Sequence, residues 1–272
     1  MINKNIQLVF FSPTGTTETV TRAVVKGIGC TVGRTLDLTR SAPEADIRFI
    51  AEDVVIVGAP VYGGRLPTLA VERLKAISGQ NTPVIPIVVY GNRAYEDALL
   101  ELSDLCEAQG FRTIAAGAFI GQHSFSSTAL PIAVGRPDVA DLQFAEQFGG
   151  QIAKLLRACE SIFRLEAPVL PGNRPYKPAM GPTRPVATEV DLRLCTLCGK
   201  CVAVCPANAV HMTDGGPVTE SCLWCLACLH NCPIGARAVV LPKVIEVAQR
   251  LYATCQVRKQ PETFLANHYD SA

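Results

Sequence analysis

The first part of the chain alternates between apolar runs and amphipathic stretches, which is the pattern of a sheet layered between helices. Short runs rich in Val, Ile, Leu, Phe and Ala predict five strands, at residues 6–11, 34–38, 53–60, 84–91 and 111–120. Helix-like spacing of apolar positions follows the strands, at residues 16–29, 67–77, 94–109 and 139–159. Strands that are apolar on both faces and alternate with helices belong to a parallel sheet covered on both sides. We therefore predict one doubly wound α/β domain over residues 1–163.

The composition changes after this domain. Residues 167–185 contain six prolines, and because such a segment has neither helix nor strand character we predict a semi-rigid extended linker over residues 164–187. A compact cysteine-rich domain follows over residues 188–242. Residues 243–272 are expected to hold one amphipathic helix, at 243–252, and a polar tail that frays.

Composition and charge narrow the classes of function. The chain has 272 residues, of which 49% are apolar and 18% charged, and its net charge is +1. This balance argues against nucleic acid or a membrane surface as the main partner. The first residues lack the long apolar region and cleavage site of a signal peptide, and no apolar run approaches the roughly 18 residues of a membrane span. We therefore expect a soluble cytoplasmic protein.

Eight of the twelve cysteines lie in two runs of identical spacing. Residues 195–205 read CTLCGKCVAVC and are followed by Pro206, and residues 222–232 read CLWCLACLHNC and are followed by Pro233. Three thiolates spaced by two residues can surround one face of a cubic iron–sulfur core, whereas the fourth, next to its proline, ligates the other cluster. We predict two [4Fe–4S] clusters, the first held by Cys195, Cys198, Cys201 and Cys232 and the second by Cys222, Cys225, Cys228 and Cys205.

Two other interpretations of the cysteines fit less well. Structural zinc uses two CxxC pairs separated by a longer stretch, rather than a triple run followed by proline. A disulfide framework would spread its cysteines over a small exported domain. The four isolated cysteines are predicted to be small buried hydrophobic residues; they are Cys30, Cys106, Cys159 and Cys255.

Residues 188–242 resemble the two-cluster bacterial ferredoxins, since all eight ligand positions and both prolines are present. The resemblance implies a small α+β domain with pseudo-twofold symmetry, in which two clusters lie close enough to exchange electrons. Trp224 and His230 stand beside ligand positions. The main interpretation of both is packing or shielding of the clusters from solvent, and the other is a role as redox relay.

Residues 12–17, SPTGTT, follow the first strand and open the first helix. Gly15 permits an unusual backbone angle, and a helix N-terminus presents unpaired N–H groups to an anion. Hydroxyl groups add further donors, on Ser12, Thr14, Thr16 and Thr17. The loop lacks the lysine of GxxxxGK[ST] and the glycines of GxGxxG, so it suits a monophosphate held by neutral donors. A plain helix N-cap is the alternative.

Two more loops follow the third and fourth strands at the same edge of the predicted sheet, GAPVYGGRLP at residues 58–67 and YGNRAYEDAL at residues 90–99. Ligands of open α/β sheets bind at this edge. Together with SxTGxT in the first loop, these segments make residues 1–163 resemble the flavodoxin family. The resemblance implies a flavodoxin-like five-stranded parallel sheet in the order 2-1-3-4-5 and a bound FMN. The whole chain is similar to flavodoxin–ferredoxin fusion proteins of anaerobic bacteria and archaea.

The flavodoxin resemblance also implies which residues contact the flavin. The phosphate would be held by Ser12, Thr14, Gly15, Thr16 and Thr17. One side of the isoalloxazine ring would be lined by Pro60, Val61, Tyr62, Gly63 and Gly64. The other side would be lined by Gly91, Asn92, Arg93 and Tyr95.

The chain departs from the flavodoxin pattern in two places. Flavodoxin loops after the third strand often carry a tryptophan, yet the one tryptophan of this chain, Trp224, lies in the ferredoxin-like part. Loops after the fourth strand are usually acidic, whereas this one has Arg93, which would stabilise an anionic reduced flavin if it pointed inward. An outward surface position is the alternative for Arg93. His123, after the fifth strand, is interpreted either as a loop-anchoring residue or as a proton donor to reduced flavin.

These features leave two main hypotheses of function. In the first, the chain is an electron-transfer protein that passes low-potential electrons between two [4Fe–4S] clusters, FMN and a partner protein. In the second, it is an FMN-dependent reductase of a small molecule, such as a quinone or an activated alkene, fed by its own ferredoxin domain. A substrate-sized cavity over the ring favours the enzyme, and a ring covered by protein favours the carrier. The intact loops oppose a third reading, a flavodoxin-like domain that has lost FMN.

Overall fold

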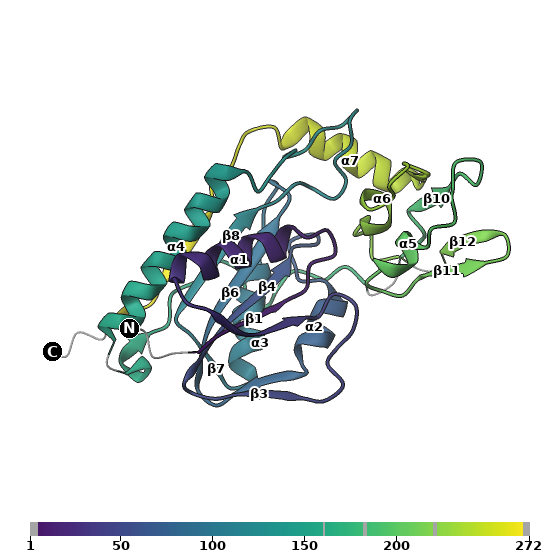
Figure 1. Cartoon of the computed structure of the whole chain (residues 1–272). Coiled ribbons are helices and arrows are strands. Elements are labelled where there is room, and N and C mark those ends of the chain that lie inside the picture. Colours follow the sequence, from purple (N-terminus) through teal and green to yellow (C-terminus); the bar gives the residue numbers. More distant parts are fainter. Residues whose placement is uncertain (1–4, 160, 182–183, 220–221, 269–272) are drawn as a thin grey trace.

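The computed structural model describes residues 5–159, 161–181, 184–219 and 222–268. Its centre is a sheet with the strand order β14-β8-β6-β4-β1-β2 and with β7 beside β6 (Figure 1). The strands are β1 (Asn5–Phe10), β2 (Val32–Asp37), β4 (Asp53–Pro60), β6 (Thr82–Tyr90), β7 (Phe111–Thr113), β8 (Ala115–Ile120) and β14 (Glu262–Leu265). Because β2, β1, β4, β6 and β8 pair in parallel in that order, the predicted five-stranded arrangement 2-1-3-4-5 is confirmed.

The tail was expected to fray, but up to residue 268 it is ordered and adds β14 to the edge of the sheet, whereas residues 269–272 lie outside the described residues. This strand pairs antiparallel with β8, from Glu262 opposite Ala118 to Leu265 opposite Ala115. Its successive side chains reach opposite cores, since Phe264 packs on one side of the sheet and Leu265 on the other. The prediction missed the strand because only four residues form it, too few to show a clear alternation.

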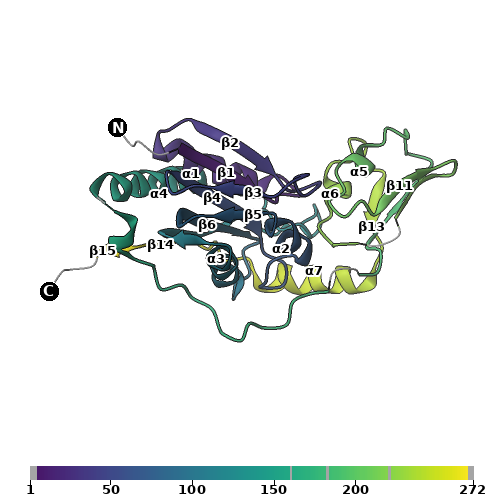
Figure 2. The ribbon, with the colours of Figure 1, turned by 90° about the horizontal axis from the view of Figure 1, so that it is seen from below.

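Helices cover both faces of the sheet, as Figures 1 and 2 show. Along β1 the side chains alternate between two cores, with Leu8 and Phe10 in one and Val9 in the other. The first core is closed by α1 (Thr16–Ile28) and α4 (Val139–Ala158), and the second by α2 (Thr68–Leu74) and α3 (Ala98–Ala108).

The helices α1 and α4 approach closely because glycines lie where they touch. A Cβ atom on Gly27 would lie 1.9 Å from the carbonyl oxygen of Glu146, and one on Gly149 would lie 2.1 Å from that of Val24. No side chain fits at such distances. This contact buries Phe148 and seals the core on that side of the sheet.

Several short elements lie outside the predicted pattern. They are a parallel pair, β3 (Ile47–Phe49) with β5 (Ile77–Gly79), an antiparallel pair, β9 (Leu165–Glu166) with β15 (Asn267–His268), and the 3-10 turn η1 (Ile162–Arg164). Strands of two or three residues carry no readable period, so only the folded chain reveals them.

The described part of the proline-rich segment that follows β9, residues 167–181 and 184–187, contains no helix or named strand, but it is not a free spacer. The backbone N–H groups of Asn173 and Lys177 donate to the carboxylate of Asp97, at 2.9 and 2.7 Å. The bond from Lys177 and that from Asn173 hold the pKa of this buried carboxyl below its ordinary value. Arg174 donates to Asp104 at 2.9 Å. Figure 2 shows the segment passing along the side of the domain that carries α3.

The cysteine-rich domain consists of short paired elements. They are β10 (Thr188–Val190) with β13 (Arg237–Val239), β11 (Val210–Thr213) with β12 (Gly216–Thr219), and the helices α5 (Lys200–Ala203) and α6 (Ala227–His230). One short helix follows the second cysteine of each run, as the predicted pseudo-twofold repeat requires. The fold class predicted for the whole chain, an α/β domain followed by a small α+β domain, is confirmed.

The helix α7 (Pro242–Thr254) returns from the cysteine-rich domain to the α/β domain (Figure 1). At its start Val244 packs with Ala187 and Leu226, and at its end Leu251 packs with Ile132. The helix therefore ties the two domains together. In the part of the chain that the structure describes, no helix combines the length and apolar character needed to cross a membrane.

Candidate cofactor sites

A cavity of about 320 Å³ opens at the carboxyl ends of β4, β6 and β8, above the start of α1. Eight residues predicted to contact a flavin line it, namely Thr14, Thr16, Pro60, Val61, Tyr62, Gly63, Gly91 and Arg93. A smaller pocket adjoins it at the first loop and shares Thr14, Thr16 and His123 with it. The three loops that the sequence singled out therefore converge on one elongated space.

The loop over residues 12–17 has the geometry of an anion site. Gly15 occupies the N-cap of α1 with a left-handed φ of 83°. Within the described residues, no acceptor contacts the backbone N–H groups of Thr16 and Thr17, which belong to the first turn of the helix. The hydroxyl groups of Thr14 and Thr16 border the cavity. These neutral donors suit a phosphate group.

Two hydroxyl residues of this loop do not line the cavity. Ser12 shapes the loop instead, since its N–H donates to Thr39 at 2.8 Å and its Oγ accepts from the N–H of Glu18 at 3.0 Å. Thr17 is buried and faces Gly58 on β4. Both residues were predicted to hold phosphate. In the structure the side chain of Ser12 accepts a hydrogen bond within the loop, and the side chain of Thr17 packs against β4.

Two further predicted flavin contacts, Gly64 and Tyr95, do not line the cavity. Gly64 faces the carboxylate of Glu96. The hydroxyl of Tyr95 donates to Glu262 on β14 at 2.8 Å, and its ring packs 5.4 Å from that of Tyr90. Burial, followed by the bond to Glu262, raises the pKa of Tyr95 well above its ordinary value. Tyr90, at the end of β6, borders the cavity in its place.

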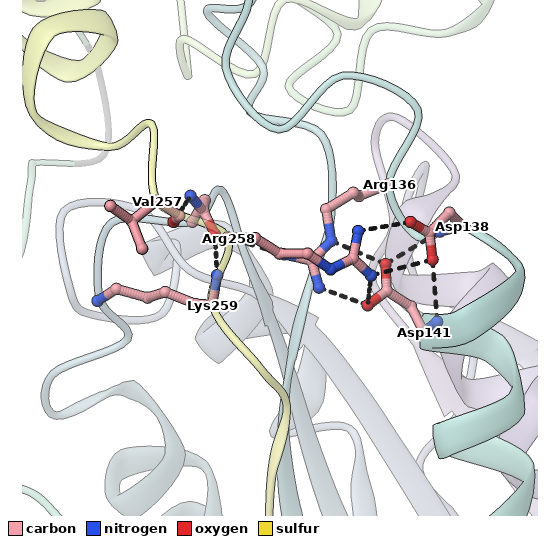
Figure 3. A network of polar contacts seen from close by, with 7 residues as sticks. Arg136, Asp138, Asp141, Val257, Arg258 and Lys259 are labelled. Atoms are coloured by element: carbon pink, nitrogen blue, oxygen red, sulfur yellow. Dashed lines mark hydrogen bonds and ion pairs between the residues drawn. The ribbon is translucent and has the colours of Figure 1, made fainter.

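Asn92 serves as an anchor for the C-terminal segment rather than as a flavin contact. Its side-chain amide donates to the carbonyl oxygens of Cys255 and Val257, at 2.8 and 2.9 Å. Figure 3 shows the neighbouring contacts, in which Arg258 reaches the carboxylates at the start of α4. Arg258 donates to Asp138 at 2.6 Å and to Asp141 at 3.1 Å. The network holds the chain that follows α7 against the loop after β6.

The roof of the cavity comes from segments far away in the sequence. It consists of Lys177, Met180 and Arg184 of the proline-rich segment, Trp224 of the cysteine-rich domain, and Val247, Arg250 and Leu251 of α7. None of these residues was predicted to line the site. The one available signal was Trp224, which stands between Cys222 and Cys225.

Trp224 places at the cavity the tryptophan that the loop after β4 lacks. Its indole N–H donates to the carbonyl oxygen of Pro185 at 2.8 Å. The guanidinium carbon of Arg184 lies 5.0 Å from the ring centroid, a cation–π contact. The backbone of Arg184 also bridges to that of Cys222. The proline-rich segment thus fixes the tryptophan at the junction between the two domains.

His123 and Tyr62 are uncharged groups at the cavity wall. Burial lowers the pKa of His123 to about 4, and Arg93 acts in the same direction. The N–H of Phe125 donates to Nδ1 of His123 at 3.0 Å, so the neutral ring carries its proton on Nε2. Burial, with Cys225 nearby, raises the pKa of Tyr62 well above its ordinary value. Both side chains therefore offer hydrogen-bond donors near neutral pH.

The first predicted set of cluster ligands surrounds one small cavity. Its lining includes Cys195, Cys198, Cys201 and Cys232, together with Pro233. The fourth ligand comes from the other cysteine run, as the spacing rule predicts. The cavity lies on the outer side of the domain, where Cys198 is exposed.

The two runs of cysteines adopt the same backbone path. Leu197 and Gly199 flank the second cysteine of the first run with φ values of 56° and 70°. Trp224 and Leu226 flank the second cysteine of the other run with values of 62° and 54°. Such left-handed residues turn the chain so that successive thiols face the same side. Equal spacing in the sequence therefore becomes equal geometry.

The second predicted set of ligands is gathered on the side facing the α/β domain. Burial raises the pKa of the Cys225 thiol, and Cys228, Cys222 and Cys205 act in the same direction. The N–H groups of Trp224 and Ala209 lie 3.3 Å from the sulfurs of Cys222 and Cys205. Hydrogen bonds to sulfur of this kind adjust cluster potentials. The described residues contain no group of three or more His, Cys, Asp or Glu closed around a single metal ion.

Two arginines of the α/β domain hold the cysteine-rich domain in place. Arg40 donates to the carbonyl oxygens of Val202, at 3.0 Å, and of Cys205. Arg73, which is buried on α2, donates to the carbonyl oxygen of Pro206 at 2.7 Å. Burial, reinforced by Arg40, lowers the pKa of Arg73. These contacts grip the chain at and beside a predicted ligand of the second cluster.

Comparisons with known proteins bear on both domains. Residues 188–211 match the family of 4Fe-4S binding domains. The chain is similar to a flavodoxin from the domain Archaea, with 14% identity over 56% of this chain and 99% of that one and a TM-score of 0.36. It is also similar to Flavodoxin 1 from Bacillus cereus, with 18% identity over 56% and 98% of the two chains and a TM-score of 0.40. A third similar structure is a flavodoxin, WrbA-like protein from Agrobacterium tumefaciens. The identity is 20% over 57% of this chain and 98% of that one, with a TM-score of 0.38.

The α/β domain is assigned by its own topology. The observed order β2-β1-β4-β6-β8, with every neighbouring pair parallel, is the flavodoxin-like order. The cysteine-rich domain carries the family match and repeats its own backbone path. The chain therefore joins a flavodoxin-like domain to a 4Fe-4S ferredoxin domain in one polypeptide.

Proposed function

We propose that the chain is an electron-transfer protein in which two [4Fe–4S] clusters and FMN form one path that ends at a partner protein. One observation carries this proposal. Trp224 lies between two predicted ligands of the second cluster, and it also lines the cavity at which the three flavodoxin-like loops converge. A cluster and a flavin at these positions would share a wall.

The residues at the cavity fit FMN. Its volume of about 320 Å³ is at the lower end of the range for small-molecule sites. The open N–H groups and hydroxyls of the first loop would bind the phosphate, and Tyr62 and Gly91 would border the ring. Bound FMN would supply a centre that accepts one or two electrons, whereas each cluster carries one. The chain's own part is to hold the ring, exclude water and keep the clusters near.

The arrangement also indicates an order of transfer. The second set of cysteines faces the α/β domain, where Arg40 and Arg73 contact the backbone at Cys205 and Pro206. The first set lies on the outer side, with Cys198 exposed. A partner protein would therefore exchange electrons with the first cluster, the second cluster would connect it to the flavin, and Trp224 would stand between the second cluster and the ring.

The roof of the cavity favours the carrier over the reductase of small molecules. Met180, Arg184 and Trp224 close the side on which a quinone or alkene would need room beside the flavin. Met180 in particular lies against Gly63, with its sulfur 2.6 Å from the place a Cβ atom would occupy.

The test begins with anaerobically purified protein and its iron, acid-labile sulfide and flavin per chain. We expect about eight irons and one FMN. Rapid mixing with a low-potential reductant should then show reduction of the clusters followed by the flavin, and replacing Trp224 by Ala should slow the second phase at least tenfold. Eight irons without FMN, even after FMN is added, would contradict the proposal, as would a flavin that stays oxidised beside reduced clusters.

A further inference from the structure

The roof of the flavin cavity carries an excess of positive charge. Four cationic side chains line the cavity, namely Arg93, Lys177, Arg184 and Arg250, and none of the described residues that line it is Asp or Glu. They come from the loop after β6, the proline-rich segment and α7. We call these four residues the cationic wall. Charges of one sign brought together from three segments indicate an anion that the cavity binds.

Arg184 is a partly buried member of the cationic wall. Its Nε atom is buried and has no hydrogen-bond partner among the described residues. Its guanidinium carbon lies 5.0 Å from the centroid of the Trp224 ring. A cation withdrawn from water without a carboxylate partner is costly unless a ligand supplies the negative charge.

Lys177 and Arg93 are only half compensated. Both pair with Glu96, Arg93 at 2.5 Å, so that one carboxylate serves two cations. Glu96 itself lies outside the cavity lining. One carboxylate therefore faces two of the four cations, and the cationic wall keeps a net positive charge.

The flavin phosphate does not account for this charge. The smaller pocket at the first loop is lined by Thr14, Thr16, Arg136 and four other residues, and no member of the cationic wall is among them. Arg136 in turn is held by both oxygens of Asp141. The phosphate end is therefore served by neutral donors and helix N–H groups, and the cationic wall faces the other end of the space.

We propose that the cationic wall stabilises the reduced flavin as an anion, so that the site takes up two electrons with one proton. The inference rests on the proposed function. Two reduced [4Fe–4S] clusters each lose one electron, one proton enters from solvent, and the flavin gains both electrons and the proton while keeping one negative charge. The positive wall binds this form more tightly than the neutral oxidised form, which raises the flavin potential. A higher flavin potential favours transfer of electrons from the clusters to the flavin.

The test is equilibrium potentiometry of the FMN-loaded full chain between pH 5 and pH 8. We compare wild type with Arg184→Gln, which removes the charge, and Arg184→Lys, which keeps it. Lys177→Gln is a second variant in case the first disturbs the domain junction. Arg34→Gln removes the same charge from an exposed position on β2, away from the cavity, and serves as control.

At pH 8 we expect Arg184→Gln to bind the reduced anion at least tenfold less tightly relative to the oxidised form, which lowers the two-electron potential by about 30 mV. The difference in potential between wild type and Arg184→Gln should shrink toward pH 5, because there the reduced flavin of the variant takes up a second proton and becomes neutral. Arg184→Lys should restore most of the wild-type potential. Arg34→Gln should leave it unchanged at every pH.

Two results would overturn the inference. A potential that is the same in wild type, Arg184→Gln and Lys177→Gln at pH 8 would show that the wall does not act on the reduced flavin. A shift that is equal at pH 5 and pH 8 would show a structural disturbance rather than charge. Failure of the proposed function looks different, because then FMN does not bind at all, or it binds and shows these shifts but receives no electrons from the clusters.

Discussion

The two cofactor regions of this molecule are built in opposite ways. The eight cysteines come from two short runs, residues 195–205 and 222–232, whose equal spacing becomes equal backbone geometry. The flavin cavity is assembled from loops, the proline-rich segment, the ferredoxin domain and α7, which span most of the chain. Local spacing thus defines one site, and the packing of distant segments defines the other. The two should therefore respond differently to the same kind of perturbation.

Removal of the clusters should have the largest effect and should divide the molecule. The buried core cluster around Leu226 is small, with Ala187 and Val244 as its other buried members, whereas the α/β domain has two large cores of its own. Because cluster binding supplies folding free energy to so small a core, chelation of iron should unfold residues 188–242 and leave the central sheet folded. Hydrogen exchange should show lost protection in β10 and β13 and retained protection in β4 and β6. Loss of protection in both regions would contradict this separation.

Single ligand substitutions should sharpen the contrast between the two cysteine sets. Cys225→Ser and Cys198→Ser should each reduce the iron content from about eight to about four per chain. Only Cys225→Ser should also weaken FMN binding, by about tenfold, because its neighbour Trp224 lines the flavin cavity. The measurement is iron analysis with a fluorescence titration of FMN. Equal FMN affinities in the two variants would mean that the ferredoxin domain is not part of the flavin site.

The pH dependence of stability should reveal the neutral state of His123, which is partly buried in the α/β domain. Burial lowers the pKa of His123 to about 4, whereas the unfolded chain binds this proton near pH 6.5. The stability is therefore full above pH 6.5 and falls as the pH drops toward 4, by about 2 kcal/mol between pH 7 and pH 5. Denaturant unfolding of wild type and His123→Asn should show the slope only in wild type. Replacement of the exposed His211 by Asn is the control, and a flat wild-type profile would contradict the neutral state.

Two adjacent glycines of α4 should give the smallest but best matched comparison. A Cβ atom on Gly149 would lie 2.1 Å from the carbonyl oxygen of Val24, whereas for Gly150 the nearest atom is 3.9 Å away. Gly149→Ala should lower the free energy of unfolding by about 1–3 kcal/mol. Gly150→Ala should leave it unchanged or raise it by up to about 1 kcal/mol, because alanine favours a helix interior. Thermal unfolding distinguishes the two, and equal changes would refute the close helix contact.

Much of the fold follows from the pattern of apolar positions. The runs at β1, β4, β6 and β8 are long and buried on both faces, so a parallel sheet could be predicted, and the resemblance to flavodoxins implied the order of its strands. The strand β14 could not be predicted, because four residues are too few to show a period and form a strand only by pairing with β8. The proline-rich segment could be recognised as extended, but its attachment to Asp97 depends on a partner far away in the sequence.

The same division applies to the flavin site. Thr14, Thr16, Tyr62 and Gly91 were predicted from motifs and line the cavity. Tyr95 and Asn92 were predicted from the same loops, but they face Glu262 and Cys255, which lie in the C-terminal segment. A motif places a loop at the site, and the neighbours of that loop decide which of its side chains face the ligand.

The sequence by itself determined the main strands of the sheet, the cysteine spacing and the candidate phosphate loop, because each depends on residues close together in the chain or on a repeated period. Only the tertiary structure decided that Trp224 and Arg184 cover the flavin cavity and that cationic side chains gather there without carboxylates. The physical reason is that contacts between distant segments arise from packing and charge pairing in the folded state. No local spacing encodes those contacts.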